Sequence, residues 1–293
     1  MKFMNYIARM NNIKTIAVCG AGTMGSGIAQ LAAQAGFTTL QFDVNKEMLE
    51  KSKASIEKSL QYLIEKNKIT QKQKTATLNN LVFINNINEC KADVIIEAII
   101  EKKDAKINLF NELEKINNNH TIFATNTSSI SINEIAEGCN QSSQIVGMHF
   151  FNPATIMKLV EVVKSKFTTD AVVESIIDVC KQMNKVAVVC KDAPGFIVNR
   201  VARHYYLEAM KLVELNLATI ENVDAIMEAS GFKMGPFKLM DLIGMDINYS
   251  VSNIVWEALQ KPERLKPSAL QQQKVNAGEL GRKTGKGFYA YNK

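Results

Sequence analysis

A glycine-rich turn near the start of the chain limits what this sequence can fold into more than any other feature. The segment Val18-Cys19-Gly20-Ala21-Gly22-Thr23-Met24-Gly25 continues a short β-rich run that begins at Thr15. Beyond the turn, apolar side chains recur at helical spacing, at Ile28, Leu31, Ala32 and Ala35. A strand that passes through G-x-G-x-x-G into a helix is the pattern of a dinucleotide-binding βαβ unit.

Each residue of the turn has a physical role in that pattern. Gly20 permits the tight turn, Gly22 lets the backbone approach a pyrophosphate, and Gly25 lets the helix pack closely on the strand. The first helical residues, Thr23 and Met24, bring unpaired N–H groups and the positive end of the helix dipole to the phosphates. We therefore expect these five positions to bind a nucleotide cofactor.

An acidic residue, Asp43, ends the next apolar run and indicates which cofactor this is. Its carboxylate can accept hydrogen bonds from the adenosine ribose hydroxyls and would repel a 2′-phosphate. Val44 and Asn45 supply no arginine that could hold such a phosphate. The sequence therefore favours NAD over NADP, although Lys46 leaves the strictness of that preference open.

The composition sets the scale of the molecule and excludes several classes. The 293 residues suffice for one large or two modest domains, and a hydrophobic content of 46% supports substantial cores. The net charge of +6 is spread along the chain, so it indicates either a solvated basic surface or attraction to a polyanionic ligand. No nucleic-acid motif accompanies it, and we expect no metal site.

The cysteines and the N-terminal segment bear on the compartment. Five scattered cysteines without C-x-x-C spacing are typical of reduced thiols in a cytoplasmic protein. Residues 1–13 precede the first strand as an extension, and they lack the apolar segment and cleavage site of a signal peptide. No apolar run is long enough for a membrane span.

Alternating β-rich and helical segments organise residues 1–191. This order predicts an α/β, Rossmann-type, doubly wound parallel sheet that forms the NAD-binding domain. The predicted strands are 15–19, 39–43, 81–84, 94–97, 121–125, 145–149, 158–163 and 186–189. The predicted helices are 22–35, 46–66, 70–78, 106–116, 132–137 and 169–183.

The pattern changes at Asp192-Ala193-Pro194-Gly195, and only helical periodicity follows. Pro194 suits the first turn of a helix that Asp192 would help to cap. We expect an all-α domain over 192–293, with helices at 196–217, 220–230, 236–242, 245–259 and 268–277. The apolar face of 196–217 is broad, so this helix is either the centre of a bundle or a contact with another subunit.

An enzyme that oxidises an alcohol with NAD needs a base for the hydroxyl proton, and histidine suits this role. His149 ends a predicted strand, at the sheet edge where ligands bind in open α/β folds. The two other histidines, His120 in an Asn-rich loop and His204 within a helix, are better explained as solvated or structural. His149 is therefore our candidate base.

Other polar residues could complete the site. Glu161 lies in an apolar strand pattern, where it either points outward or accepts the imidazole N–H. Asn126 and Ser128 follow the strand 121–125; they either meet cofactor and substrate or precede a helix cap. Asn199, one turn into its helix, either reaches a substrate oxygen or is simply exposed. The lysines of the 46–66 helix form a solvated face or a docking surface for a polyphosphorylated substrate.

Seven stretches together resemble the L-3-hydroxyacyl-CoA dehydrogenase family, and most of all its bacterial 3-hydroxybutyryl-CoA dehydrogenases. The resemblance covers nearly everything from Ile13 onward, and it departs at Thr155-Ile156, where a Pro-Val-like pair is usual. HFFNP with the following LVEV, and DAPGFxxNR, are far more specific than the glycine motif. The stretches are 20–30, 95–101, 124–132, 147–163, 191–200, 234–244 and 281–291.

The resemblance implies a role for each matching position. His149 matches the catalytic base and Glu161 its carboxylate partner. The remaining matches are Ser128 and Asn199, which hydrogen-bond the reacting substrate oxygen; Asp43, on the adenosine ribose; Glu101 and Lys106, near the nicotinamide; and Ser59 and Lys66, which contact the substrate CoA.

The expected function is NAD-linked, reversible oxidation of a (3S)-3-hydroxyacyl-CoA to a 3-ketoacyl-CoA in fatty acid or butanoate metabolism. The resemblance also implies a homodimer formed through the helical domain. Three alternatives stay open at this point: a longer or carboxylated acyl-CoA, a free hydroxy acid or sugar acid, and a non-catalytic nucleotide-binding or structural protein.

Overall fold

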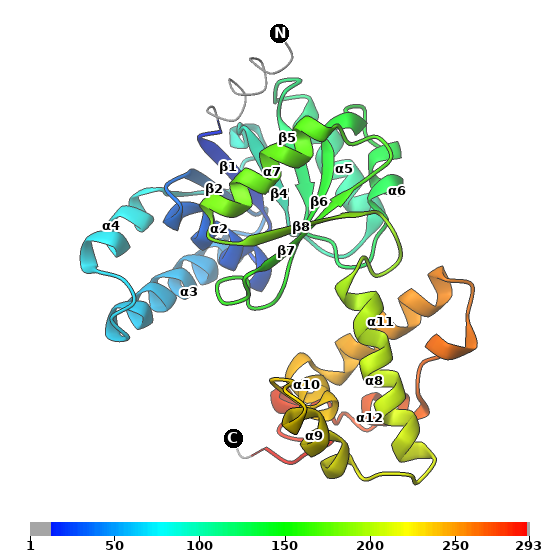
Figure 1. Cartoon of the computed structure of the whole chain (residues 1–293). Coiled ribbons are helices and arrows are strands. Elements are labelled where there is room, and N and C mark those ends of the chain that lie inside the picture. The colour runs from blue at the N-terminus through cyan, green and yellow to red at the C-terminus, as the bar shows by residue number, and fades with distance from the viewer. Residues whose placement is uncertain (1–12, 292–293) are drawn as a thin grey trace. The chain divides into compact units, whose positions relative to one another are not determined.

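The computed structural model describes residues 13–291, so the extension over 1–13 lies almost wholly outside the described residues (Figure 1). The described chain forms two compact units, one ending at Asp192 and the other beginning at Ala193. The first contains a sheet and its flanking helices, and the second is helical. The α/β class with an all-α C-terminal region, predicted from the sequence, is confirmed.

Eight strands of the first unit form one sheet in the order β3-β2-β1-β4-β5-β6-β7-β8. The order steps outward in both directions from β1 and β4, which is the doubly wound arrangement, and the crevice between these two strands is where such sheets bind ligands. The strands are β1 Thr15–Cys19, β2 Thr38–Phe42, β3 Leu81–Ile84, β4 Val94–Glu97, β5 Ile122–Thr125, β6 Ile145–Phe150, β7 Leu159–Lys164 and β8 Val186–Lys191.

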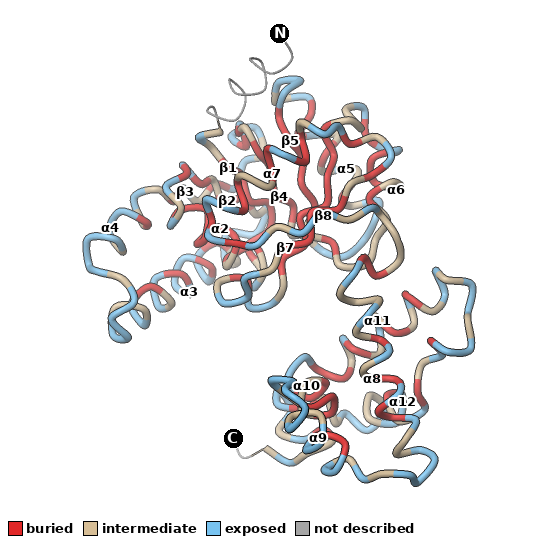
Figure 2. Tube along the Cα trace, viewed as in Figure 1, coloured by how far each residue is buried: buried red, intermediate tan, exposed pale blue. Residues whose placement is uncertain are grey.

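Helices cover both faces of this sheet, so its central strands are continuous apolar runs. The helices are α2 Thr23–Gln34, α3 Lys46–Glu65, α4 Gln71–Asn79, α5 Lys103–Glu114, α6 Ile132–Glu137 and α7 Asp170–Gln182. Strand β5 shows the alternation: Ala124 joins the core beneath α2, α3 and α7, while Phe123 meets Phe110 of α5 edge-on at 5.6 Å. The central strands are accordingly buried in Figure 2.

One pairing departs from the expected parallel sheet, because β6 and β7 are antiparallel. The connection between them, 151–158, is too short to return a strand in the same direction, which takes a crossover of a dozen residues or more. The pairs on either side, β5–β6 and β7–β8, are parallel. The turn back after β6 places His149 directly opposite Glu161 in the ladder.

The helical unit packs around a core that includes Met210, Phe237, Met240 and Met245. Its helices are α8 Val198–Glu214, α9 Ile220–Ala229, α10 Pro236–Ile243, α11 Met245–Ala258 and α12 Ala269–Asn276. No helix in the described part of the chain is long and apolar enough to cross a membrane.

The starts of two helices and one helix cap differ from the expectation. Helix α8 begins two residues later than 196, since Gly195 and Phe196 have positive φ angles of 72° and 48°. The expectation that Asp192 caps this helix is wrong, because its carboxylate accepts hydrogen bonds from Ser131 Oγ (2.6 Å) and Asn133 N (2.8 Å) at the start of α6. Helix α5 starts at Lys103, not at Lys106.

Candidate active site

The turn between β1 and α2 needs glycine at two of its three glycine positions. Gly20 has φ of +108°, and a Cβ there would lie 2.5 Å from the carbonyl oxygen of Ala98. A Cβ on Gly25 would lie 1.9 Å from the carbonyl oxygen of Gly20. Nothing lies within 4 Å of a Cβ on Gly22. The space above Gly22 is therefore open to a ligand, while the other two glycines are required by the fold.

The start of α2 is suited to an anion. Gly22 is the N-cap and has no side chain to cap the first turn, which begins with Thr23 and Met24. The neighbouring hydroxyl of Ser26 donates to the carbonyl oxygens of Ala21 (3.2 Å) and Gly22 (2.8 Å), so it does not compete for the N–H groups. Backbone donors at an uncapped helix start bind phosphate.

Asp43 holds the glycine turn through its carboxylate. Its Oδ2 accepts from the N–H of Ala21 at 2.8 Å, and its Oδ1 accepts from Asn45 N at 2.9 Å. Beside it lies a pocket of about 370 Å³ that sequence reasoning did not predict. Its lining residues come from three separate segments: Phe42, Val44, Asn85, Asn86, Ile87, Leu109 and Glu112.

His149 and Glu161 form a buried pair. Nδ1 of His149 lies 2.8 Å from Oε2 of Glu161, and the two residues are 6% and 1% exposed. The ring of Phe151 lies against the imidazole, with centroids 4.5 Å apart. Because the carboxylate accepts from Nδ1–H, it fixes the tautomer in which Nε2, on the other side of the ring, carries the lone pair.

A second network, in which Lys106 and Glu97 are buried and Glu101 is exposed, lies at the carboxyl end of β4. Lys106 Nζ is 2.6 Å from Oε1 of Glu97 and 3.2 Å from Oε2 of Glu101. Glu97 also accepts from Ile99 N and Thr125 Oγ1, both at 2.7 Å. Sequence reasoning named Lys106 and Glu101 but missed Glu97, although a carboxylate among apolar strand residues is the signal that singled out Glu161.

The pKa values of the two carboxyl groups in this network are shifted in opposite directions. Burial raises the pKa of Glu97, against the opposing charge and hydrogen bond of Lys106. Burial also acts to raise the pKa of Glu101, but Lys106 and the bonds from Thr127 and Ser128 outweigh it and leave that pKa below its usual value. Glu101 is therefore an anion at neutral pH, held next to a lysine.

Glu101 organises the loop after β5. Its Oε1 accepts from Thr127 Oγ1 (2.5 Å), Ser128 N (3.0 Å) and Ser129 Oγ (3.0 Å). Asn126 Oδ1 accepts from the N–H of Phe150 at 2.9 Å, which joins this loop to the strand that carries His149. The structure thus places Glu101, Lys106, Asn126 and Ser128 around the same strand ends as His149.

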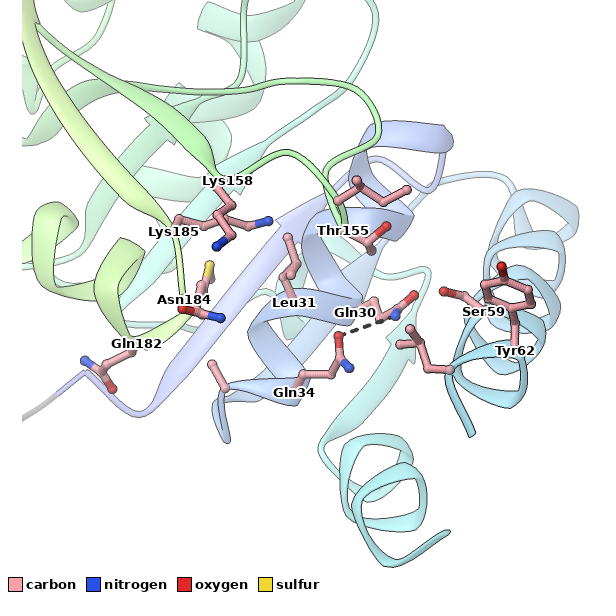
Figure 3. Close-up of a pocket in the computed structure, with 14 residues that line it drawn as sticks. Gln30, Leu31, Gln34, Ser59, Tyr62, Thr155, Lys158, Gln182, Asn184 and Lys185 are labelled. Atoms are coloured by element: carbon pink, nitrogen blue, oxygen red, sulfur yellow. Dashed lines mark hydrogen bonds between the residues drawn. The ribbon is translucent and has the colours of Figure 1, made fainter. Parts of the chain in front are cut away.

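Three further residues expected to contact the substrate belong to α3, its end and α8. Ser59 of α3 lines a pocket of about 420 Å³ in the first unit (Figure 3), and Lys66, at the end of α3, lies over the ring of Tyr62 with Nζ 5.5 Å from its centroid. Asn199 is in the first turn of α8, in the helical unit, where its carbonyl oxygen accepts from Arg203 Nε. Its position relative to His149 stays a prediction.

Among residues 13–291, no group of three or more His, Cys, Asp or Glu side chains could hold a metal ion. The His149–Glu161 pair can transfer a proton, and the glycine turn belongs to the same unit of the chain.

Two family models match consecutive parts of the chain. The NAD-binding domain of 3-hydroxyacyl-CoA dehydrogenase matches residues 15–193, and the C-terminal domain of the same family matches 195–291. The match by sequence thus extends over both compact units.

Individual relatives agree with these models. The chain is 42% identical to a 3-hydroxyadipyl-CoA dehydrogenase of Escherichia coli over 96% of its length, and spans 59% of that protein. It is 40% identical to a probable 3-hydroxybutyryl-CoA dehydrogenase of Bacillus subtilis, with 95% of this chain and 98% of the relative covered. The crystal structure of an Escherichia coli 3-hydroxybutyryl-CoA dehydrogenase superposes with a TM-score of 0.93 at 41% identity, covering 96% of this chain and 60% of that one.

Proposed function

The chain belongs to the 3-hydroxyacyl-CoA dehydrogenase family, whose members are NAD-dependent oxidoreductases, and on that premise we propose that it interconverts (3S)-3-hydroxybutyryl-CoA and acetoacetyl-CoA. The observation that carries this proposal is the His149–Glu161 pair, a buried imidazole and carboxylate 2.8 Å apart. The physiological setting we propose is fatty acid or butanoate metabolism in the cytoplasm, a compartment that fits five free cysteines.

His149 is the acid–base group in this mechanism. With Nδ1 bound to Glu161, Nε2 accepts the proton of the C3 hydroxyl during oxidation and returns it to the C3 oxygen during reduction. Glu161 keeps the ring oriented and stabilises the imidazolium as it forms, as the carboxylate of a catalytic triad does. Ser128 and Asn199 orient the C3 oxygen by hydrogen bonds.

The residues of the glycine turn fit NAD. Gly22, Thr23 and Met24 would hold the pyrophosphate and Asp43 the adenosine ribose, with the adenine in the adjoining pocket. Glu101 and Lys106 lie toward the nicotinamide half, as does Asn126. When bound, NAD supplies the redox step, since its nicotinamide takes up the hydride from C3 during oxidation and returns it during reduction.

The coenzyme A part of the substrate would lie along α3. Ser59 lines the 420 Å³ pocket, and Lys66 with the other lysines of α3 supplies positive charge for the phosphates. Binding energy from these contacts, remote from C3, can be used to position the reacting carbon.

A second acyl group is favoured by one relative. The Escherichia coli relative at 42% identity is named for 3-hydroxyadipyl-CoA, so a carboxylated acyl chain is the alternative substrate. Comparing kcat/KM for acetoacetyl-CoA and 3-oxoadipyl-CoA decides between the two: the proposal predicts the larger value for acetoacetyl-CoA.

We further propose that residues 1–191 form the NAD-binding domain and 192–293 a helical domain through which two copies associate. Support comes from apolar side chains of the helical unit that are exposed in a single copy, among them Val201 (64%) and Ile247 (49%). Light scattering should give the mass of a dimer, and an Ile247→Asp variant should shift that mass towards a monomer. A monomeric wild type would refute this part of the proposal.

The experiment that tests the function is NADH oxidation, followed at the absorbance of reduced nicotinamide, with acetoacetyl-CoA. Free acetoacetate and NADPH serve as the matched controls for the CoA handle and for the cofactor. The proposal predicts rapid turnover only with the CoA ester and NADH. Equal rates with free acetoacetate, or none with either acyl-CoA despite NADH binding, would contradict it.

A further inference from the structure

Lys185 is a buried cation that the chemistry proposed above does not use. It is 7% exposed, and its Nζ donates to the carbonyl oxygens of Ala154 (2.6 Å) and Met157 (2.8 Å). No carboxylate pairs with it in the part of the chain that the structure describes. Burial lowers the pKa of its ammonium. A buried charge is costly unless it is well hydrogen-bonded, so the contacts with two carbonyls are what keep this lysine in place.

The backbone around Lys185 aims its side chain at those carbonyls. Its N–H donates to Cys180 O at 2.8 Å as α7 ends, after Asn184 has reversed the chain with a positive φ of 56°. The next N–H, of Val186, donates to Lys158 O at 2.8 Å. Lys185 thus lies at the junction of α7 and β8, fixed on both sides by main-chain bonds.

The segment that Lys185 holds is the short connection between the strands of His149 and Glu161. Within it, the N–H groups of Ile156 and Met157 both donate to Pro153 O at 3.0 Å, which folds 153–157 into a compact turn. On the other side Ala154 packs so closely on α2 that a Cβ on Gly27 would lie 3.2 Å from its own. The turn is therefore held between α2 and the Lys185 ammonium.

The outer side of this turn forms a wall of the pocket that contains Ser59. Thr155 and Ile156 line the pocket, and Ile156 is 73% exposed. In Figure 3, Lys158 and Lys185 lie at one end, Ser59 and Tyr62 at the other, with Gln30 and Gln34 between them. The Lys185 ammonium points away from open solvent, toward the carbonyl oxygens of the 153–157 turn, whereas Lys158 is exposed.

We propose that Lys185 is a positioning residue: by binding Ala154 O and Met157 O it fixes the 153–157 turn as the pocket wall opposite Ser59, and so sets the affinity for the coenzyme A part of the substrate. This role rests on the proposed function, which places coenzyme A along α3. It acts on substrate binding and leaves the proton-transfer pair and the glycine turn unchanged.

The test compares Lys185→Met with Lys158→Met. Both variants remove one positive charge from the same pocket, but only the first removes the bonds to the turn. Lys185→Met should raise KM for acetoacetyl-CoA about tenfold, with kcat changed less than about twofold and NADH affinity unchanged. Amide hydrogen exchange of a peptide spanning 151–158 should accelerate in this variant alone.

The KM values, the exchange rates and the wild-type activity each test a different part of the proposal. A KM no higher than that of Lys158→Met would mean that only charge is lost, and would overturn the positioning role. Unchanged hydrogen exchange over 151–158 in Lys185→Met would show that Lys185 does not fix the 153–157 turn, whatever the substrate is. Failure of the wild type to reduce any acyl-CoA would instead overturn the proposed function. The exchange measurement would still decide whether Lys185 fixes the 153–157 turn.

Discussion

The two halves of the proposed site are built from different parts of the chain. The cofactor turn is made of backbone: Gly20 and Gly25 are glycines because carbonyl groups occupy the space of a side chain. The reaction centre is made of side chains, since His149 and Glu161 are buried charged or polar groups facing each other across two strands. A substitution that adds a side chain should therefore disturb the glycine turn, whereas one that removes a side chain should disturb the reaction centre.

The comparison also explains how rigidly each half is held. An antiparallel ladder fixes the His149–Glu161 register, because a slip of one residue in β7 would turn Glu161 to the face of the sheet opposite His149. The glycine turn has no such ladder, and Asp43 steadies it through the N–H of Ala21. The account therefore predicts large catalytic effects at the pair and separable effects on binding and stability at the turn.

The largest effect is expected for His149→Ala. Removing the base should lower kcat for acetoacetyl-CoA reduction by ~10³-fold or more, because general acid–base catalysis contributes about 10²–10⁴-fold. NADH binding, measured by fluorescence titration, should stay within about twofold of the wild type. Turnover close to the wild-type value would show that another group transfers the proton.

Glu161→Gln should act in the same direction but less strongly. Glutamine keeps the shape of the buried side chain and can still bond the ring, but it cannot offset the imidazolium charge. We expect kcat to fall by ~10²-fold with thermal stability nearly unchanged. A loss of folding without a specific loss of kcat would mean that Glu161 is structural.

The glycine turn offers a matched pair of variants. Gly25→Ala forces a Cβ to 1.9 Å from a carbonyl oxygen. Such overpacking should lower the free energy of unfolding by about 1–3 kcal/mol, and Tm should fall accordingly. Gly22→Ala meets no atom within 4 Å, so it should leave Tm unchanged and raise the Kd for NADH about tenfold or more, by occupying the space of the pyrophosphate. Equal effects of the two variants on Tm would refute this distinction.

The smallest effect concerns the thiols of the sheet unit. Burial raises the pKa of Cys139 and of Cys180 to about 12 from an ordinary value near 9. The unfolded chain ionises these thiols first, so their contribution to stability is present below pH ~9 and is lost as the pH rises toward ~12. Denaturant unfolding at pH 8 and pH 10.5 should show the decrease, and Cys139→Ala should reduce it.

The parts of the molecule that could be predicted from sequence are those formed by residues close together in the chain. The eight strands lie within one or two residues of their predicted ends, because each is a short β-rich run that contrasts with the helical patterns around it. The dinucleotide turn was recognisable because its glycines and Asp43 follow in order on one βαβ unit. The antiparallel turn after β6 was missed, although the shortness of 151–158 pointed to it.

What sequence reasoning could not supply depends on contacts between distant segments. An apolar strand with a carboxylate leaves two orientations for Glu161, and only the register with His149 chooses between them. The bonds of Asp192 to the start of α6 and the Glu97–Lys106 ion pair likewise join residues that local patterns treat separately. The apolar residues before Glu97 indicate that its carboxylate needs a partner, but they do not identify that partner as Lys106.

The most direct test of the central claim, that Glu161 acts through His149, is a double-mutant cycle on kcat for acetoacetyl-CoA reduction. His149→Ala, Glu161→Gln and the double variant would be compared with the wild type, with NADH affinity as the control for folding. The account predicts that Glu161→Gln costs nothing further once His149 is gone, so the double variant equals His149→Ala. Losses that multiply would show that the two residues act independently, and would contradict it.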